Sequence, residues 1–216
     1  KKVVLSGDGI EWRREKWGVL AKAVHKMGER IAVRWADKIV VDNAEVGNYY
    51  TNKYQVETAE IAYGANDLNT DAVRTRELLE KYQLTAKQYF LFVGRLAPEK
   101  GVHNLIAAYK QLDTTWPLVI IGDDANGGEY RDSLFAQASD DIRFLGFIYN
   151  SDYEQLVLHA YLYVSASELE GTSPSLVSAM GAGVCVLVNG IEENVATTKD
   201  AACLYEKNSQ QDLVHD

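Results

Sequence analysis

The sequence predicts an α/β protein with two doubly wound parallel sheets, and three observations support this prediction. Short apolar runs rich in β-branched and aromatic residues alternate with longer amphipathic stretches along the chain. This alternation is typical of parallel sheets covered by helices on both faces. A polar, turn-rich stretch at residues 64–71 (GANDLNTD) separates two such series. We therefore expect two similar domains, the first of them incomplete.

The first series contains three expected strands and two expected helices. The strands are predicted at residues 3–5, 38–41 and 60–63, and the helices at 10–35 and 45–54. Spacings of three and four between apolar residues predict the long amphipathic helix: Trp17, Leu20, Val24, Met27, Ile31 and Trp35. The chain starts in a strand-like run, KKVVLSGDG, without Met. We interpret it as a fragment that begins inside a domain.

The second series predicts a larger sheet. After a helix at 73–82, strands are expected at 89–93, 118–121, 142–145, 161–167 and 184–188, with helices at 102–112, 130–138, 152–159 and from Pro174. The expected divisions are residues 1–64 for the first domain, 65–87 for a linker and connecting helix, and 88–216 for a second domain lacking its final helix. Ligands of open parallel sheets bind beyond the carboxyl ends of the strands, so functional residues are expected in the loops there.

Composition and charge limit the class of protein. A hydrophobic share of 47% and a charged share of 25% are typical of a soluble globular protein. The net charge of −9 argues against a general nucleic-acid binder. The sequence shows no apolar stretch near the ~20 residues of a membrane span and no signal peptide, so we expect a cytoplasmic location. Cys185 and Cys203 have apolar neighbours and are predicted to be buried thiols in a reducing compartment.

A phosphate site is predicted within Ser165–Gly183, SASELEGTSPSLVSAMGAG. Glu170 and Gly171 follow an apolar strand and precede a helix. Gly171 would let the backbone approach a ligand, and the free N–H groups of the first helical turn would face it. Like charges repel, so Glu170 is assigned to neutral hydroxyls beside the phosphate, such as those of a sugar. The alternative is an ordinary strand–turn–helix with an exposed glutamate.

Two cations lie five residues apart in the loop after the expected strand 89–93, GRLAPEKG. Arg95 offers a planar fork to phosphate oxygens and Lys100 a mobile point charge, so the pair can hold a diphosphate. The alternative is that both side chains are simply solvated. Their position at the end of a strand in the sheet that also carries the predicted phosphate site favours diphosphate binding. The backbone amides of Phe144–Ile148 (FLGFI) can hold a planar base, and a plain buried strand explains this run equally well.

Three further features give weaker indications. Asp8 follows a strand, where it can touch a hydroxyl, act as a base or cap a helix. Asp123 and Asp124 are adjacent but have no evident third ligand, so no metal site is expected. Residues 11–38 contain eight Lys or Arg and four acids. The long helix can therefore face an anionic membrane surface, although a solvated helix face is the simpler interpretation.

In combination, the motifs GRLAPEKG, IRFLGFI, IAYGAND and EGTSPSLVSAMGAG resemble the large family of retaining GT-B glycosyltransferases (glycosyltransferase family 4, or glycosyl transferases group 1). The resemblance extends over nearly the whole chain. SGDGIEWRREKWG and EGTSPSLVSAM look closest to bacterial rhamnosyltransferase-like enzymes that build capsule or cell-wall polysaccharide. The resemblance implies two Rossmann-like domains: an acceptor-binding domain, of which residues 1–63 would be the last third, and a nucleotide-sugar domain from about Gln88.

The resemblance also implies roles for single residues. The implied catalytic residues are Arg95, Lys100 and Glu170, with the two cations on the donor diphosphate and the glutamate on the sugar. The implied donor-binding residues are Gly94, Ile148, Gly171, Thr172, Ser173 and Ser178. At Ser178 the family usually has a second glutamate that binds the ribose, so one hydroxyl would replace a bidentate contact. Asp8, near the position where family members often have a histidine, is placed on the acceptor side.

The implied function is transfer of a sugar, such as rhamnose, from a nucleotide-diphosphate donor to a growing polysaccharide or lipid-linked acceptor. The resemblance implies retention of configuration and no metal or other cofactor. The two cations and the helix amides would stabilise the negative charge that develops on the leaving diphosphate. A truncated or degenerate module that binds nucleotide sugar without turnover, and a sugar-nucleotide epimerase, stay open as alternatives. The fragment alone is expected to be inactive, and cytoplasmic with optional peripheral membrane contact.

Overall fold

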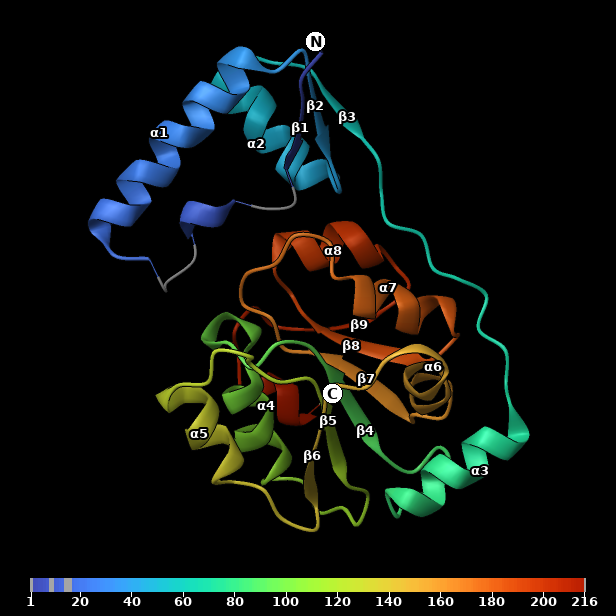
Figure 1. Cartoon of the computed structure of the whole chain (residues 1–216). Helices are drawn as coiled ribbons and strands as arrows, with labels where there is room; N and C mark the ends of the chain where they lie inside the picture. The colour runs from blue at the N-terminus through green and yellow to red at the C-terminus, as the bar shows by residue number, and fades with distance from the viewer. Residues whose placement is uncertain (1, 8–9, 14–16, 216) are drawn as a thin grey trace. The chain divides into compact units, whose positions relative to one another are not determined.

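The computed structural model describes residues 2–7, 10–13 and 17–215 of the 216-residue chain. The described residues form two compact units. The first unit comprises residues 1–64, 169–173 and 191–199, and the second comprises residues 65–168, 174–190 and 200–216. Each unit has its own sheet (Figure 1).

The first unit is built on a parallel sheet with the strand order β1-β2-β3. Its strands are β1 (Val4–Gly7), β2 (Lys38–Val41) and β3 (Thr58–Glu60). The short helix η1 (Glu11–Arg13) and α1 (Val19–Trp35) connect β1 to β2, and α2 (Ala44–Tyr54) connects β2 to β3. Helix α8 (Glu192–Thr198) also belongs to this unit. The small core consists of Val33, Ile39, Val41, Val46 and Tyr50.

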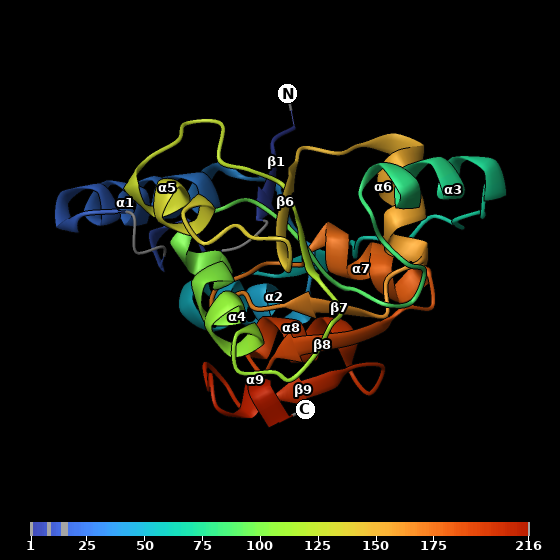
Figure 2. The ribbon, with the colours of Figure 1, turned by 90° about the horizontal axis from the view of Figure 1, so that it is seen from below.

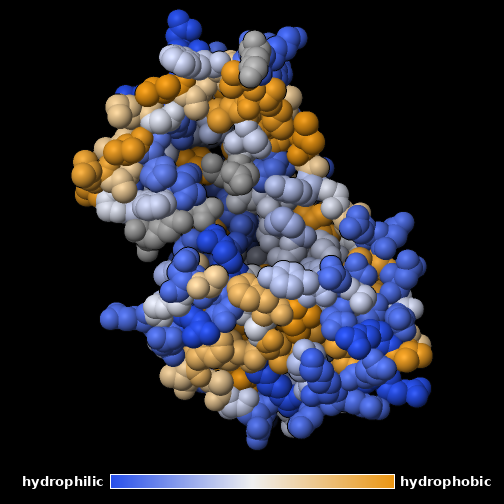
Figure 3. All heavy atoms as spheres, viewed as in Figure 1, coloured by the Kyte–Doolittle hydropathy of each residue, from blue (hydrophilic) through white to orange (hydrophobic). Residues whose placement is uncertain are grey.

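Helix α1 differs from the helix expected over residues 10–35. It begins at Val19, because Gly18 before it has an extended backbone (φ −66°, ψ 168°), and Val33 is its buried residue. Its large apolar residues lie on an exposed stripe instead of facing the core: Val19, Leu20, Val24, Met27, Ile31 and Trp35, which are 51–90% exposed. Figure 3 shows hydrophobic surface over α1. The expected amphipathic helix is therefore present, but its apolar side is uncovered.

The second unit contains a fully parallel sheet with the order β6-β5-β4-β7-β8-β9. Its strands are β4 (Phe90–Val93), β5 (Leu118–Ile121), β6 (Ile142–Gly146), β7 (Leu162–Ser165), β8 (Cys185–Asn189) and β9 (Cys203–Tyr205). All but β9 were expected from the sequence. Strand β9 has three residues and helix α8 has seven, too few to show a clear hydrophobic period.

Helices cover both faces of this sheet (Figure 2). On one face lie α4 (Val102–Tyr109), α5 (Glu129–Phe135) and α9 (Asp212–His215), and on the other α6 (Asn150–Leu158) and α7 (Pro174–Gly181). Neighbouring side chains of a strand point to opposite faces. Phe92 and Ile120 therefore join the first core layer, while Leu91 and Val119 join the second. This arrangement confirms the predicted doubly wound α/β fold.

The strand order reverses between β4 and β7. From β4 the chain moves outward to β5 and β6, and from β7 it moves outward in the other direction to β8 and β9. Open α/β sheets bind ligands beyond the carboxyl ends of their strands at such a reversal. The loop that follows β4 and residues 166–168 after β7 therefore flank the expected binding crevice of the second unit.

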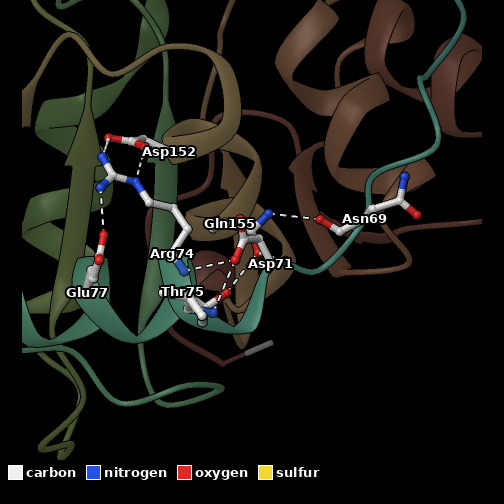
Figure 4. A network of polar contacts seen from close by, with 8 residues as sticks. Asn69, Asp71, Arg74, Thr75, Glu77, Asp152 and Gln155 are labelled. Carbon is white, nitrogen blue, oxygen red and sulfur yellow. Dashed lines mark hydrogen bonds and ion pairs between the residues drawn. The ribbon is translucent and has the colours of Figure 1, made fainter.

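A buried glutamine of α6 fixes the chain that leads into α3 (Ala72–Lys81) (Figure 4). Gln155 is 3% exposed. Its Nε2 donates to the carbonyl oxygen of Asn69 (2.9 Å), and its Oε1 accepts from the Asp71 N–H (3.0 Å) and the Thr75 hydroxyl (2.8 Å). These bonds attach residues 69–75 to the body of the second unit.

The prediction that both cysteines are buried is wrong. Cys185 and Cys203 are exposed free thiols. They are the first residues of β8 and β9, and β9 is an edge strand. Apolar neighbours in sequence predicted burial, but the two thiols lie where the strands begin.

Candidate functional site

Arg95 and Lys100 lie in the loop after β4, as the sequence predicts. The exposed guanidinium of Arg95 is 3.9 Å from the carboxylate of Glu99, which is buried. Lys100 is half-buried and ends the short helix η2 (Pro98–Lys100). The cations thus occupy the carboxyl edge of a strand that adjoins the reversal in strand order.

The loop after β4 packs directly against the chain that leaves β7. Gly101 has a left-handed backbone (φ +65°), and a Cβ there would lie 2.1 Å from the carbonyl oxygen of Ala166. The Glu168 N–H donates to the carbonyl oxygen of Glu99 (2.9 Å), and the Asn104 amide donates to the Glu168 carboxylate (2.7 Å). Glycine at position 101 therefore permits the close contact that joins the two loops at the reversal.

Three glycines end the neighbouring strands β4, β5 and β6: Gly94, Gly122 and Gly146. The Gly122 N–H donates to the carbonyl oxygen of Gly146 (2.8 Å), and the Gly94 N–H donates to that of Ile121 (3.0 Å). A Cβ at Gly122 would lie 2.0 Å from the carbonyl oxygen of Gly94, and its φ is +121°. The last position of each of these strand ends therefore carries no side chain.

Ile148 follows the glycine row at the end of β6. Its side chain is partly buried and packs against the second core layer. The role expected for the backbone amides of FLGFI in holding a base stays a prediction.

Four of the predicted residues lie in the loop between β7 and α7: Glu170, Gly171, Thr172 and Ser173. This loop is part of the first unit. Within that unit the Thr172 N–H donates to the Asp42 carboxylate (2.8 Å), and the Thr172 hydroxyl donates to the Asp42 carbonyl oxygen (3.2 Å). Helix α7 begins at Pro174, which has no N–H, so its first-turn donors start at Ser175.

Ser178 lies in α7 and contacts α6. Its hydroxyl hydrogen-bonds that of Tyr153, whose pKa is raised by burial in spite of this bond. Ser178 stands where the family usually has a glutamate that binds the ribose. Its hydroxyl therefore already has a hydrogen-bond partner inside the second unit.

Asp8 lies outside the described residues. The first unit has a cavity of about 370 Å³ at the carboxyl end of β1, lined among others by Gly7, Trp12, Glu29 and Tyr50. Sequence reasoning pointed to this strand end but missed its aromatic and acidic lining.

Glu29 of α1 is the centre of a polar network with α2. Its Oε1 accepts hydrogen bonds from Tyr49, Tyr54 and Lys53. Burial alone would raise the pKa of Glu29, but these donors outweigh it and the pKa lies below its usual value. Burial near this carboxylate raises the pKa of Tyr50 to about 12. The run NYYTNKY at residues 48–54 is the part of the sequence that could have indicated this network.

Asp123 pairs with a residue that the sequence reasoning did not consider. Arg131 forms a bidentate pair with it (2.6 and 3.0 Å), which holds the pKa of the Asp123 carboxyl below its usual value. The described residues contain no group of three or more His, Cys, Asp or Glu arranged to hold a metal ion. In the same part of the chain, no helix is both long and apolar enough to cross a bilayer.

The second unit, with its parallel sheet wound on both faces and its cations at the strand reversal, defines a Rossmann-like α/β domain. Residues 75–216 match the family Glycosyl transferases group 1, and residues 1–66 match the Domain of unknown function (DUF1972). Since the first match covers more than half of the chain, this chain belongs to the glycosyl transferases group 1 family.

Relatives and solved structures agree with this family. The O-antigen chain mannosyltransferase B of Escherichia coli is 24% identical over 160 residues, 71% of this chain and 42% of that protein. D-rhamnosyltransferase WbpZ of Pseudomonas aeruginosa is 30% identical over 142 residues, 62% of this chain and 35% of that protein. The structure of Anabaena HepE in complex with UDP and glucose has a TM-score of 0.84 at 19% identity, over 100% of this chain and 60% of HepE.

These comparisons confirm the predicted family resemblance and the GT-B fold. The chain spans less than half of each of these two curated relatives and three fifths of HepE.

Proposed function

We propose that this chain is part of a glycosyltransferase that moves a sugar from a nucleotide-diphosphate donor to a growing polysaccharide or lipid-linked saccharide. The observation that carries the proposal is the pair Arg95 and Lys100 beside the strand reversal, in a chain of this family. The relatives named for mannosyl and rhamnosyl transfer support a hexose or deoxyhexose such as rhamnose as the sugar. HepE, crystallised with UDP and glucose, supports a nucleotide sugar as the donor.

In the proposed reaction, the bond between the anomeric carbon and the diphosphate oxygen breaks, and negative charge develops on the diphosphate. Arg95 and Lys100 stabilise that charge without a metal ion, aided by the amides of Gly171 and Ser173, whereas the Thr172 N–H already donates to the Asp42 carboxylate. Glu170 holds neutral hydroxyls of the donor sugar. A diphosphate oxygen takes the proton of the acceptor hydroxyl, which attacks the same sugar face, so the anomeric configuration is retained.

The acceptor is assigned to the first unit, together with Asp8. The cavity at the end of β1 combines aromatic rings, Trp12 and Tyr50, with the carboxylate of Glu29. Apolar sugar faces pack on aromatic rings and hydroxyls donate to carboxylates, so this lining suits a saccharide.

We further propose that the enzyme works in the cytoplasm with peripheral contact to the membrane through α1. The exposed apolar stripe of this helix is accompanied by four cations at intervals of four residues, namely Lys22, Lys26, Arg30 and Arg34. An apolar stripe with neighbouring cations is typical of helices that lie on anionic bilayers.

The proposed function is tested by Arg95→Ala and Lys100→Ala in the full-length enzyme. A charge-assisted hydrogen bond contributes about 1.5–3 kcal/mol, so each variant should lower kcat/KM about 10- to 150-fold. Lys110→Ala is a matched control, because Lys110 is exposed and contacts Gln137. Unchanged turnover in both variants would contradict the assignment of the diphosphate to this loop.

A nucleotide-sugar module without turnover is the second candidate, and Ser178 favours it because its hydroxyl already bonds Tyr153. Calorimetry with nucleotide sugars, combined with a product assay on the full-length protein, distinguishes the two: binding without transfer supports the module. Conversion of donor without any acceptor would instead indicate an epimerase.

A further inference from the structure

Two aromatic rings are exposed at the end of β6, next to the glycine row. Phe147 is 49% and Tyr149 66% exposed. Their ring planes are parallel within 10° and the ring centroids are 6.1 Å apart. Single exposed apolar side chains are common on protein surfaces, but a stacked pair of exposed rings at the carboxyl edge of a parallel sheet indicates a binding surface.

The residue between the two rings is anchored. Ile148 is partly buried and packs against the second core layer, whereas Phe147 and Tyr149 on either side of it are exposed. The near-parallel rings and their short centroid distance place Phe147 and Tyr149 side by side.

The position of the rings relative to the cation loop matches the shape of a nucleotide. Strand β6 is two strands away from β4, and adjacent strands lie about 4.8 Å apart, which gives roughly 10 Å. An extended nucleoside diphosphate has a similar length from its phosphates to its base. Between the two points lies the row of Gly94, Gly122 and Gly146, and a Cβ at Gly146 would meet no atom within 4 Å.

We propose that Phe147 and Tyr149 form a stacking platform for the nucleobase of the donor and supply most of the base affinity. This inference rests on the proposed function. Every base has a π-face, so stacking of about 1–3 kcal/mol per base is tolerant of base identity. The protein should therefore bind nucleoside diphosphates with different bases at similar strength, and the rings should act on all of them alike.

The test uses calorimetry on the full-length protein with UDP, GDP, ADP and dTDP, and with inorganic diphosphate. The double variant Phe147→Ala/Tyr149→Ala should weaken every nucleotide about 5- to 150-fold and leave diphosphate unchanged. The conservative pair Phe147→Tyr/Tyr149→Phe keeps both rings and should bind as the wild type does. Tyr63→Ala is the control, because Tyr63 is an exposed tyrosine of the first unit.

The outcomes separate this inference from the proposed function. If the wild type binds nucleotides and the double variant binds them equally well, the platform is wrong while the proposed function stands. A weakening confined to one base would also overturn it, because the rings would then act in selection of that base. If the wild type binds diphosphate but no nucleotide, the proposed donor is wrong and the platform with it. An unchanged melting curve shows that the exposed rings can be removed without unfolding.

Discussion

Single residues at the carboxyl edge of the second sheet are set by backbone geometry as much as by chemistry. Gly122 combines a φ of +121° with a carbonyl oxygen 2.0 Å from the place of a Cβ, whereas Gly127 has a φ of +67° and open space around it. Both conformations disfavour a side chain, but only the first also involves a clash with backbone atoms. The difference allows the steric requirement of the glycine row to be measured separately from backbone strain.

Gly122→Ala should therefore lower the free energy of unfolding by more than about 3 kcal/mol, the upper end of strain at one residue, because backbone must move as well. Gly127→Ala should cost about 1–2 kcal/mol, since it adds left-handed strain alone. Denaturant melts monitored by circular dichroism provide both values. Equal losses for the two variants would show that the contact with Gly94 does not constrain position 122.

At the level of elements, the contact between α3 and α6 depends on one buried amide. Gln155 satisfies three polar groups of residues 69–75. The neighbouring Arg74 forms a bidentate pair with Asp152, both contacts at 2.7 Å, which holds the pKa of that carboxyl below its usual value. The Arg74 side chain is 41% exposed, so solvent screens this pair and the glutamine is expected to dominate.

Gln155→Leu should destabilise the protein by about 1–3 kcal/mol per buried group left without a partner. It should also speed amide exchange at Asp71, whose N–H loses its acceptor. The exposed Gln111 serves as control, because Gln111→Leu should change stability by less than about 0.5 kcal/mol. Hydrogen exchange read by mass spectrometry checks the local effect. Unchanged amide exchange at Asp71 in Gln155→Leu would show that Gln155 does not hold residues 69–75 in place.

For the whole molecule, the distribution of charge is more informative than its sum. The chain has a net charge of −9, but α1 has four cations and one acid. Its exposed apolar stripe lies on the same helix. An acidic protein with one basic, apolar helix is expected to approach an anionic bilayer with that helix, because the remaining surface is repelled.

The full-length protein should therefore sediment with vesicles that contain phosphatidylglycerol and stay free with phosphatidylcholine alone. Arg30→Gln/Arg34→Gln should weaken vesicle binding roughly 30-fold, at about 1 kcal/mol per cation near the surface. Leu20→Glu/Met27→Glu should abolish it, and Lys110→Gln should have no effect. Absence of binding would exclude the membrane contact. So would a Leu20→Cys thiol that resists labelling in a Cys185→Ser/Cys203→Ser background, which removes the two native exposed thiols.

Much of the fold could be predicted because the relevant signals are local. The apolar runs KIVV and LVII became β2 and β5 as expected, and the alternation with helices predicted parallel sheets. Local patterns failed where burial depended on distant elements. Cys185 and Leu20 have apolar neighbours in sequence, yet both are exposed, because they lie at the start of β8 and on the apolar stripe of α1.

The sequence could predict which loops carry the candidate site, but it could not predict which residues of those loops touch each other. Sequence alone determined the family motifs, the doubly wound fold and the position of Arg95 and Lys100 after a strand, since periodicity and turn chemistry act within a few residues. Only the tertiary structure decided that Gly101 touches Ala166, that Ser178 bonds Tyr153 and that Phe147 and Tyr149 stand exposed beside the glycine row. These features join or expose residues according to strand order and side-chain packing, which no short stretch of sequence contains.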